Sequence, residues 1–450
     1  MSIVKTIVLF VIFAVLAVYV YFYEIKGGEE RELEEQTAQK VIPFEKDSVK
    51  NVEIRSTSDR FYFERMDDTW RIEKPIETGA DKTMIDRLLN NIRNMRLVRE
   101  FTIKAEEQKN YGLADRAYRV TVQFNNGKRD SVRFGDATPV GGDVFAARND
   151  TLVYTVPSYV KTTVSKGLFD WRNKSLTQIQ QKDVKEFSLK NSHGVFHFVK
   201  EGDSWLIKEP RETRAENAVV DGVLRKFETG KAKSIISEEL KSPQKYDLAR
   251  PAYQIDFYLG DAKAHKNVIL SRLKNNISNV KDDSRPQVMT VDSLFIRDID
   301  KTLYQFRYKN ISEYDKNSVD SIVVTQGDSI LYLTKKGEED WFLNGKQKVK
   351  SWKMNTLLTT VNNLKAKSFL MDNVSAPTKY GLDKPERKIE IFQHGNKIQS
   401  VVLGTYKNKK VAFSPGSKMV VEIENNAYKN LEVKPADFVD TSVKKPEDMS

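Results

Sequence analysis

The 450-residue sequence contains no cysteine and only four histidines. Without cysteine there is no disulfide, no Cys-x-x-Cys metal or redox motif, and no lipoprotein signal. The absence does not decide the compartment, because a cysteine-free chain fits both the cytosol and an extracytoplasmic space that forms no disulfides. His-Glu-x-x-His, Gly-x-Ser-x-Gly and glycine-rich phosphate-loop motifs are also missing. The sequence therefore lacks the common local motifs of zinc, serine-hydrolase and nucleotide chemistry.

The few histidines are not spaced as a metal site. His193 and His197 are expected on one face of a strand, where a separation of four residues places them about 13 Å apart at about 3.3 Å per residue. That distance is too long for the two side chains alone to chelate one metal ion. His265 and His394 are expected in hairpin turns. All four are assigned surface or packing roles.

Clustered acids offer no better candidate. Asp67-Asp68 and Glu338-Glu339-Asp340 fall in predicted turns, where solvated loop carboxylates are the expected role and a catalytic dyad is the alternative. The sequence therefore predicts no catalytic residue, no cofactor-binding residue, no cofactor and no metal ligand. The protein is not expected to be an enzyme.

Charge is abundant and mixed. Lys and Arg number 74 against 63 Asp and Glu, a net charge of +11. Because the basic residues alternate with acids and form no stripe, we expect a solvated lysine-rich surface and no nucleic-acid binding. The alternative is attraction to anionic lipid headgroups or other envelope polyanions.

One long apolar run stands at the N-terminus. Residues 7–23 carry no charge, and the stretch 3–23 comprises 21 residues with Lys5 near its end. Such a helix spans about 31 Å, close to one hydrocarbon core. A cleaved signal peptide is the alternative, disfavoured because the run exceeds the usual apolar region and no small-x-small site closes it. We expect a transmembrane anchor over 1–23 and an acidic stalk over 24–45.

Flanking charge suggests an orientation for this anchor. Lys5 lies on the short N-terminal side, and six acids against two basic residues follow the run between residues 24 and 35. Basic residues prefer the cytoplasmic side. We therefore expect a bacterial inner-membrane protein that spans once, with a cytoplasmic N-terminus and an extracytoplasmic, periplasmic bulk. Ala14 and Ala17 mark one side of the helix where another helix could approach closely.

The rest of the chain repeats itself. Trp70, Trp205 and Trp341 are spaced 135 and 136 residues apart. A fixed period of this kind predicts tandem copies of one structural unit. A second series with nearly the same spacing is Tyr111, Tyr246 and Tyr380. We expect copies over 46–178, 179–313 and 314–443, followed by a disordered tail, 444–450.

Each copy shows the same succession of patterns, which predicts an α+β fold. Alternating apolar residues around the tryptophan indicate an antiparallel meander. An apolar stripe with helical spacing follows, with Asp81 and Ser351 as N-cap candidates. A tyrosine-containing turn then leads into a hairpin, marked in the first copy by Asn126-Gly127. The three tryptophans are expected in the core, with a ligand platform as the alternative.

At these residues the chain resembles a bacterial family, the domain of unknown function 4340. Its Tyr-Gly-Leu-Asp-x-Pro turn is matched fully by residues 380–385, while residues 111–115 lack the proline and residues 246–251 lack the glycine. Residues 171–176 resemble its closing motif, and the resemblance covers roughly 47–443. The family has no established catalytic residues, and its members are typically single-pass envelope proteins. Many are encoded beside ABC transporters similar to those associated with gliding motility.

Three functions are compatible with these patterns. The resemblance implies a membrane-anchored extracytoplasmic accessory or scaffold protein that partners ABC transporter subunits. A module that binds envelope glycan would instead show copy-specific pockets rich in exposed aromatics. An enzyme with a site formed between repeats would show a buried cluster of perturbed carboxylates.

Overall fold

The computed structural model of the protein describes residues 10, 12–14, 16–17, 19–21, 40–115, 117–375 and 377–442. The predicted tail 444–450 and most of the predicted stalk lie outside the described residues. The last part of the stalk region joins the first copy, because Val41 and Ile42 are buried in its core and Phe44 packs against Phe124 with ring centroids 5.7 Å apart.

The predicted membrane anchor is contradicted. Within the part of the chain that the structure describes, no helix is long and apolar enough to cross a membrane. The sequence argument relied on the length of an apolar run, which does not by itself establish a helix of that length. The single-pass topology and the inner-membrane location inferred from it are therefore wrong as predicted.

The first copy forms a nine-stranded antiparallel sheet with short helices. Its elements are η2 (Lys46–Ser48), β1 (Val49–Arg55), β2 (Arg60–Met66), β3 (Thr69–Lys74), β4 (Thr78–Gly79), α3 (Lys82–Arg93), β5 (Arg99–Thr102), η3 (Ala105–Tyr111), β6 (Tyr118–Phe124), β7 (Arg129–Ala137), β8 (Asp143–Ala147), β9 (Leu152–Pro157), α4 (Tyr159–Val164) and α5 (Leu168–Trp171).

The second copy repeats this order of elements. They are η4 (Gln181–Asp183), β10 (Val184–Asn191), β11 (Gly194–Glu201), β12 (Ser204–Glu209), β13 (Thr213–Arg214), α6 (Asn217–Thr229), β14 (Ser234–Ser237), η5 (Pro243–Tyr246), β15 (Tyr253–Leu259), β16 (Ala264–Leu270), β17 (Ile277–Asp282), β18 (Val288–Asp292), α7 (Ser293–Ile299) and α8 (Leu303–Phe306).

The third copy does so again. Its elements are η6 (Lys316–Ser318), β19 (Ser321–Gln326), β20 (Ser329–Lys336), β21 (Asp340–Leu343), β22 (Gln347–Lys348), α9 (Ser351–Asn362), β23 (Ser368–Met371), η7 (Thr378–Tyr380), β24 (Arg387–Gln393), β25 (Asn396–Tyr406), β26 (Lys409–Ser414), β27 (Met419–Glu422), α10 (Asn425–Asn430) and α11 (Pro435–Phe438).

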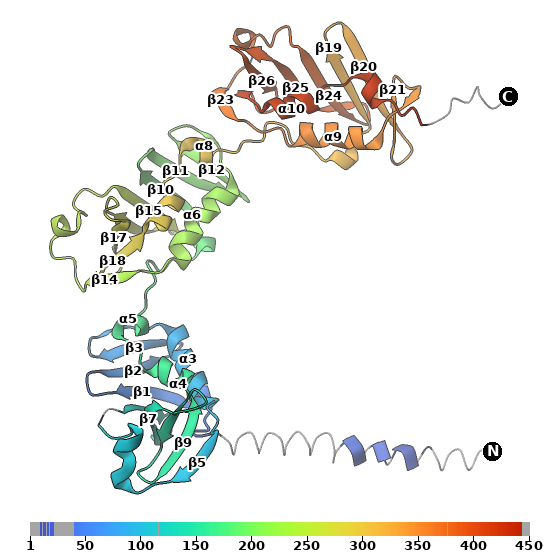
Figure 1. Cartoon of the computed structure of the whole chain (residues 1–450). Coiled ribbons are helices and arrows are strands. Elements are labelled where there is room, and N and C mark those ends of the chain that lie inside the picture. The colour runs from blue at the N-terminus through green and yellow to red at the C-terminus, as the bar shows by residue number, and fades with distance from the viewer. Residues whose placement is uncertain are drawn as a thin grey trace, which may run out of the picture. The chain divides into compact units, whose positions relative to one another are not determined.

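All three sheets share one strand order. In the first it runs β4-β3-β2-β1-β6-β7-β8-β9-β5, and the other two follow the same scheme. One longer helix lies against each sheet, α3, α6 or α9 (Figure 1). The α+β repeats predicted from the sequence are confirmed, and each contains more strands than the predicted meander and hairpin.

The tryptophans lie in equivalent places. Each is buried on the third strand of its sheet and stands opposite a basic residue of the preceding strand, Arg65, Lys200 or Lys335. The backbone carbonyl of each tryptophan accepts a hydrogen bond from the N–H of the residue two before the helix, Ala80, Ala215 or Val349, at 2.8 to 2.9 Å. Because side chain and backbone are both committed to packing, the core role expected for these residues is confirmed.

The tyrosine turn and a strand-ending glycine meet in space. The turn ends in a left-handed residue: Gly112, Asp247 or Gly381. In the first copy a Cβ on Gly135 would overlap the carbonyl oxygen of Tyr111. The turn of the first copy therefore lies directly on the backbone of that strand, where a residue larger than glycine would overlap it.

The described contacts divide the chain into two compact units. One consists of residues 1–175 with 231–235, and the other of residues 176–230 with 236–450. The second unit therefore holds most of the second copy and all of the third. The domain boundaries predicted from the sequence stay predictions.

Candidate functional site

The predicted candidate residues do not converge. His197 lies on β11, where its Nε2 is 2.8 Å from Glu186 Oε1. His265 lies on β16 and not in a turn, with its Nε2 2.9 Å from Asp256 Oδ1. His193 occupies the turn before β11 and not a strand. Among the described residues, no three His, Cys, Asp or Glu side chains are grouped to hold a metal ion.

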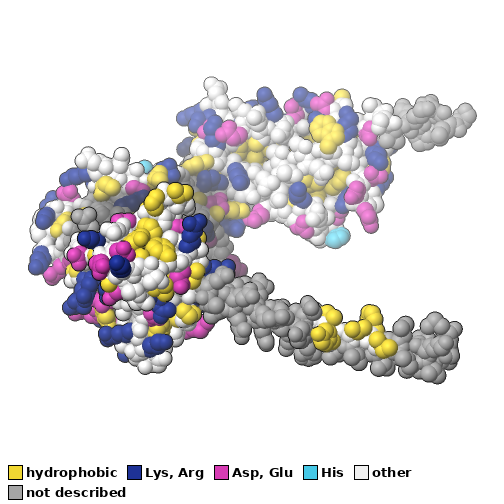
Figure 2. Space-filling view, turned by 60° about the horizontal axis from the view of Figure 1, so that its bottom comes forward, with side chains coloured by type: hydrophobic (Ala, Val, Ile, Leu, Met, Phe, Trp, Pro, Cys, Tyr) yellow, Lys and Arg dark blue, Asp and Glu magenta, His cyan; other side chains and the backbone are white. Residues whose placement is uncertain are grey.

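The predicted acidic turns are confirmed for Asp67, Asp68, Glu338 and Glu339, whereas Asp340 belongs to a strand. Asp67 lies in the β2–β3 turn with a left-handed backbone, φ 51°. Asp340 opens β21 and pairs with Lys348 at 2.9 Å. Figure 2 shows Lys and Arg interspersed with Asp and Glu over the visible surface, with patches of hydrophobic side chains between them.

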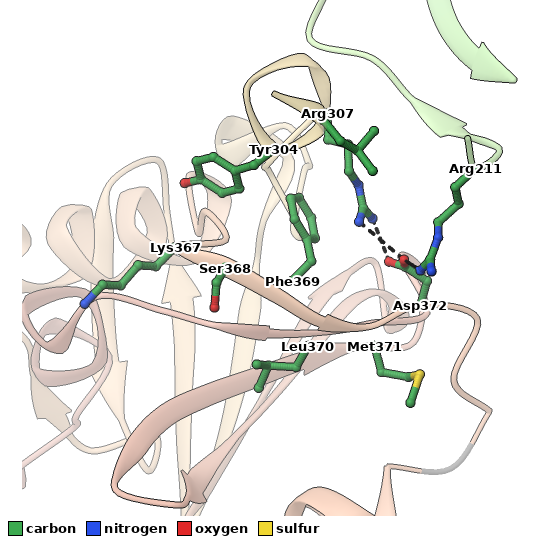
Figure 3. Close-up of a pocket in the computed structure, with 10 residues that line it drawn as sticks. Arg211, Tyr304, Arg307, Lys367, Ser368, Phe369, Leu370, Met371 and Asp372 are labelled. Atoms are coloured by element: carbon green, nitrogen blue, oxygen red, sulfur yellow. Dashed lines mark hydrogen bonds and ion pairs between the residues drawn. The ribbon is translucent and has the colours of Figure 1, made fainter. Parts of the chain in front are cut away.

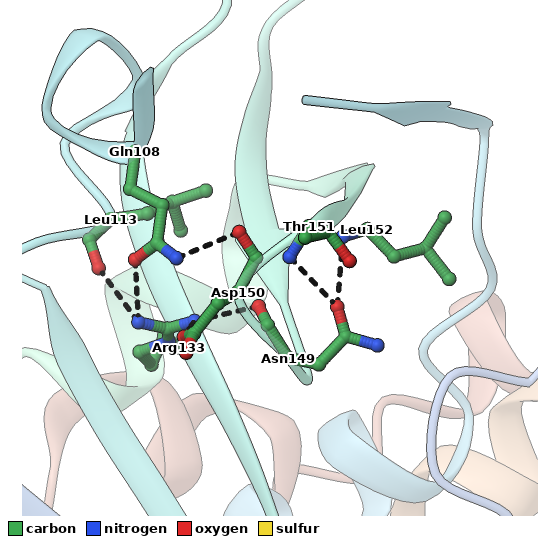
Figure 4. A network of polar contacts seen from close by, with 7 residues as sticks. All are labelled: Gln108, Leu113, Arg133, Asn149, Asp150, Thr151 and Leu152. Carbon is green, nitrogen blue, oxygen red and sulfur yellow. Dashed lines mark hydrogen bonds and ion pairs between the residues drawn. The ribbon is translucent and has the colours of Figure 1, made fainter. Parts of the chain in front are cut away.

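One polar network distinguishes the first copy. Arg133 donates to Gln108 Oε1 at 2.7 Å, to the Asn149 carbonyl at 2.6 Å and to Asp150 Oδ1 at 2.8 Å (Figure 4). Gln108 Nε2 in turn donates to the Asp150 carbonyl at 2.8 Å. Apolar residues replace Arg133 at the equivalent strand positions of the other copies, Ile269 on β16 and Val402 on β25. Because the network ties the 3-10 helix before the tyrosine turn to the β8–β9 turn, we assign it a structural role.

A groove in the second unit is the best-formed candidate site. It runs beside β23, has a volume of about 530 Å³, and is lined on its other side by α8 and the β12–β13 loop. Figure 3 shows the residues that line it. No single segment contains the groove, since its lining comes from the β12–β13 loop, from α8 and from β23.

The floor of the groove is a short stack of flat side chains. The Phe369 ring lies 6.0 Å from the ring of Tyr304, centroid to centroid, in an edge-on arrangement. The Arg307 guanidinium lies 3.5 Å from the centroid of the Phe369 ring. Leu370 and Met371 continue the apolar surface along the strand. A mostly apolar concave surface with a few polar groups is typical of binding sites.

An ion cluster closes one end of the groove. Asp372 accepts from Arg307 Nη2 at 2.6 Å and also pairs with Arg211. Arg307 is buried, with 5% of its side chain exposed, whereas Arg211 is 53% exposed. Burial alone would raise the pKa of Asp372, but the hydrogen bonds from Arg307 and Arg211 hold that pKa below its ordinary value. Two guanidinium groups therefore share one carboxylate, which leaves a positive charge at the surface.

Sequence reasoning missed these residues as a site. The available clue is that Arg307 in residues 303–311 aligns with Arg172 in residues 168–176, the closing segments of the second and first copies. Phe369 and Asp372 had no pattern to mark them. The helix stripes align Phe369 with Glu100 in the first copy and Ile235 in the second. The third copy thus contributes the Phe369 ring of the floor, and the second copy contributes Tyr304 and Arg307.

Comparison with known proteins identifies a family but no activity. The family described as "Domain of unknown function (DUF4340)" matches residues 70–251 and, in a second overlapping match, residues 205–385. No curated protein matches the chain by sequence.

Solved structures give only weak likenesses. A DNA polymerase sliding clamp from Pseudomonas aeruginosa, solved with ligand, is 7% identical, with 87% of this chain and 96% of that chain covered and a TM-score of 0.15. The DNA polymerase III subunit beta from Pseudomonas aeruginosa is 8% identical, with 87% and 97% covered and a TM-score of 0.15. Likenesses this low carry no argument about fold or function.

Proposed function

The chain belongs to the DUF4340 family, and from that premise we propose that it is a non-catalytic scaffold that binds a protein partner. The groove beside β23 is the observation that carries the proposal. It combines an apolar floor, an exposed cationic end and an accessible strand edge, which are features of a surface that recognises another chain.

Differences between the copies support the same reading. In the first copy the outer face of the sheet carries an ion-paired set in which Glu53 bonds Arg60 at 2.6 Å and Arg55 at 3.2 Å. The equivalent positions of the third copy are apolar or neutral, with Val323 in place of Glu53, Thr325 in place of Arg55 and Ile330 in place of Arg60. The buried scaffold is repeated while the exposed surface changes, as expected where one copy has been adapted to contact a partner.

Subunits of an ABC transporter are the proposed partner. This part of the proposal is supported by the family resemblance, which is an association and not a property of the groove. The groove adds only that a protein surface with acidic and apolar side chains would be complementary to it.

Affinity isolation tests the proposal directly. The tagged full chain would be used to capture partners from a detergent-solubilised extract of its source cells, in parallel with a Phe369→Asp variant. Transporter subunits recovered with the wild type and depleted with Phe369→Asp are the expected result. A Val140→Asp variant is the control, because Val140 is highly exposed and belongs to the first unit, whereas all residues that line the groove belong to the second. Recovery of no transporter subunit with any variant would overturn the proposed partner.

A further inference from the structure

The residues just before β23 already pair with another segment of the chain along the side that is open in β23 itself. β23 is the edge strand of the third sheet and, among the described strands, pairs only with β27. Just before β23, the closing segment of the second copy lies along the other side: Ala366 N donates to the Lys309 carbonyl at 2.9 Å, and Ile311 N donates to the Leu364 carbonyl at 2.9 Å.

That pairing ends where the groove begins. Tyr304 donates its hydroxyl to the Ala366 carbonyl at 3.1 Å, while the next residue, Lys367, turns its N–H to the Glu422 carbonyl of β27 at 2.7 Å. Backbone groups of a strand face its two neighbours alternately. Ile423, directly after β27, donates to Lys410 of β26, so the backbone of Glu422 faces β23, where Ser368 lies opposite it. Ser368 therefore also faces β27, and the backbone groups of Phe369 face the open side, where the groove lies.

A bulge limits how far an added chain could pair. Phe369 lies opposite Val421 and Met371 opposite Val420, so Leu370 is an extra residue with no opposite number in β27. Bulges bend a strand edge and discourage continuous pairing. The open edge thus suits a short extended segment and not a long strand of a second sheet.

The charge at the groove selects the chemistry of that segment. Arg211 and Arg307 are compensated by the single carboxylate of Asp372. Lys367, on the same strand, is about half exposed and lies 3.5 Å from Glu422 and 3.7 Å from Glu424, with Glu422 also shared by Lys409. The solvent-facing charges of the lining are therefore cationic, and Asp372 lies beneath them.

We propose that the groove binds a short, extended, acidic segment of the protein partner by adding it to the open edge of β23. Its backbone pairs at Phe369, an apolar side chain covers the Phe369 and Tyr304 rings, and a carboxylate meets Arg211. The inference rests on the proposed function as a partner-binding scaffold, and it names the chemistry of the bound segment.

A labelled peptide tests this with the full-length chain. The probe is fluorescein-labelled Val-Glu-Leu-Glu-Phe-Glu, compared with the same peptide carrying Lys or Gln in place of each Glu. Fluorescence anisotropy should show the acidic peptide binding at least about tenfold more tightly than either. Equal affinity for all three peptides, or no binding of the acidic one, would overturn the proposal.

Backbone pairing is tested on the peptide itself, so that the protein need not be changed. N-methylation of alternate residues removes the N–H groups that face one neighbour only. One methylated series should lose binding and the other should keep it. Equal effects of both series would overturn edge pairing, and hydrogen exchange should show protection at residues 366–371 on binding.

Charge reversal locates the carboxylate. The Arg211→Glu variant should bind the acidic peptide at least about tenfold more weakly than the wild type does, and it should bind the Lys peptide more tightly. Arg297→Glu is the control, because Arg297 is a largely exposed arginine on α7 of the same unit. If the peptide binds but no transporter subunit is recovered, this inference stands and only the proposed partner is rejected. If subunits are recovered but the peptide does not bind, the proposed partner stands and this inference is rejected.

Discussion

Among single residues, burial distinguishes the repeated tryptophans from others of the same type. Trp205 is 1% exposed, its ring packs against Phe187 at 5.4 Å, and its Nε1 donates to Asp221 at 3.0 Å. Trp352 on α9 is 60% exposed. Trp205→Ala should destabilise the second copy by about 3–5 kcal/mol, and Trp352→Ala by no more than about 0.5 kcal/mol. Hydrogen exchange in β11 and β12 measures the first change, and exchange in α9 measures the second.

The strand-ending glycine gives a second prediction at this scale. In Gly135→Ala the new methyl group would overlap the Tyr111 carbonyl, a backbone atom that cannot move aside alone. Overpacking of this kind costs about 1–3 kcal/mol, so exchange in β6 and β7 should accelerate. Gly167→Ala is the matched control, since a Cβ there meets nothing within 4 Å. Equal protection in the two variants would contradict the close approach of turn and strand.

Elements with a local pattern were predictable, and those defined by distant pairing were not. The helical stripe located α3, α6 and α9, because spacing along one chain segment determines a helix. β9 contains the nearly continuous apolar run Leu152–Val156, which periodicity cannot separate from a helix. Its antiparallel partner β5 lies some fifty residues earlier in the chain, and no local pattern reveals such a pair. The groove was hidden for the same reason, since Arg211 and Asp372 are separated by 161 residues.

Helix starts show where the sequence argument held and where it failed. Asp81 is the N-cap of α3, and its side chain accepts from Met84 N at 3.2 Å, as predicted. Ser351 is not an N-cap: it is the first residue of α9, and Lys350 takes the cap position without a side-chain cap bond. The Lys350 N–H instead donates to the Phe438 carbonyl of the closing segment, at 2.9 Å. The Asp81 and Glu216 N–H groups make the equivalent bond to the Trp171 and Phe306 carbonyls, both at 2.7 Å. The closing segment therefore contacts the start of all three helices, and local spacing did not reveal which residue takes that position in the third copy.

Asp81→Ala should then destabilise α3 by about 0.5–2 kcal/mol, because a cap bond to a backbone N–H is lost. Glu216→Ala provides the comparison, since Glu216 occupies the equivalent position before α6 and makes no side-chain cap bond. Hydrogen exchange at the first turns of both helices measures the difference. Similar effects of the two substitutions would show that Asp81 contributes by something other than capping.

Across the second unit, the Asp372 ion cluster connects the second and third copies. The pKa of Asp372 is lowered from an ordinary value of 3.8 by Arg307 and Arg211, in spite of burial. A carboxyl with a lowered pKa stabilises the folded state fully above its ordinary value, and this contribution is lost as the pH falls through the lower, folded value. The difference in Tm between wild type and Asp372→Asn should therefore be large at pH 7 and shrink below pH of about 4. A difference that stays constant with pH would show that the carboxylate charge is not what matters.

Arg307 carries the final prediction, because the three closing segments suggest its role. Arg172, Arg307 and Val439 make the same β-bridge at the end of each copy, and the arginine occurs in the two copies that are followed by another. Arg307 reaches forward to Asp372 at 2.6 Å, to the Phe369 ring at 3.5 Å and to Met419 Sδ at 3.3 Å. Removing one member of a buried ion pair costs about 3–5 kcal/mol, so Arg307→Ala should loosen the third copy from the second.

The absence of native cysteine allows a clean measurement of this loosening. Spin labels on Lys185→Cys in β10 and Ser329→Cys in β20, both exposed positions, report the separation of the two copies. A narrow distance distribution should broaden in Arg307→Ala and remain narrow in Arg297→Ala, which removes an exposed arginine of the same unit. If Arg307→Ala leaves the distribution unchanged, the backbone bridge between Asn310 and Lys365 is enough to hold the copies together. In that case Arg307 would contribute to binding in the groove and not to holding the second and third copies together. The Arg307→Ala variant should then still bind the acidic peptide more weakly than the wild type does.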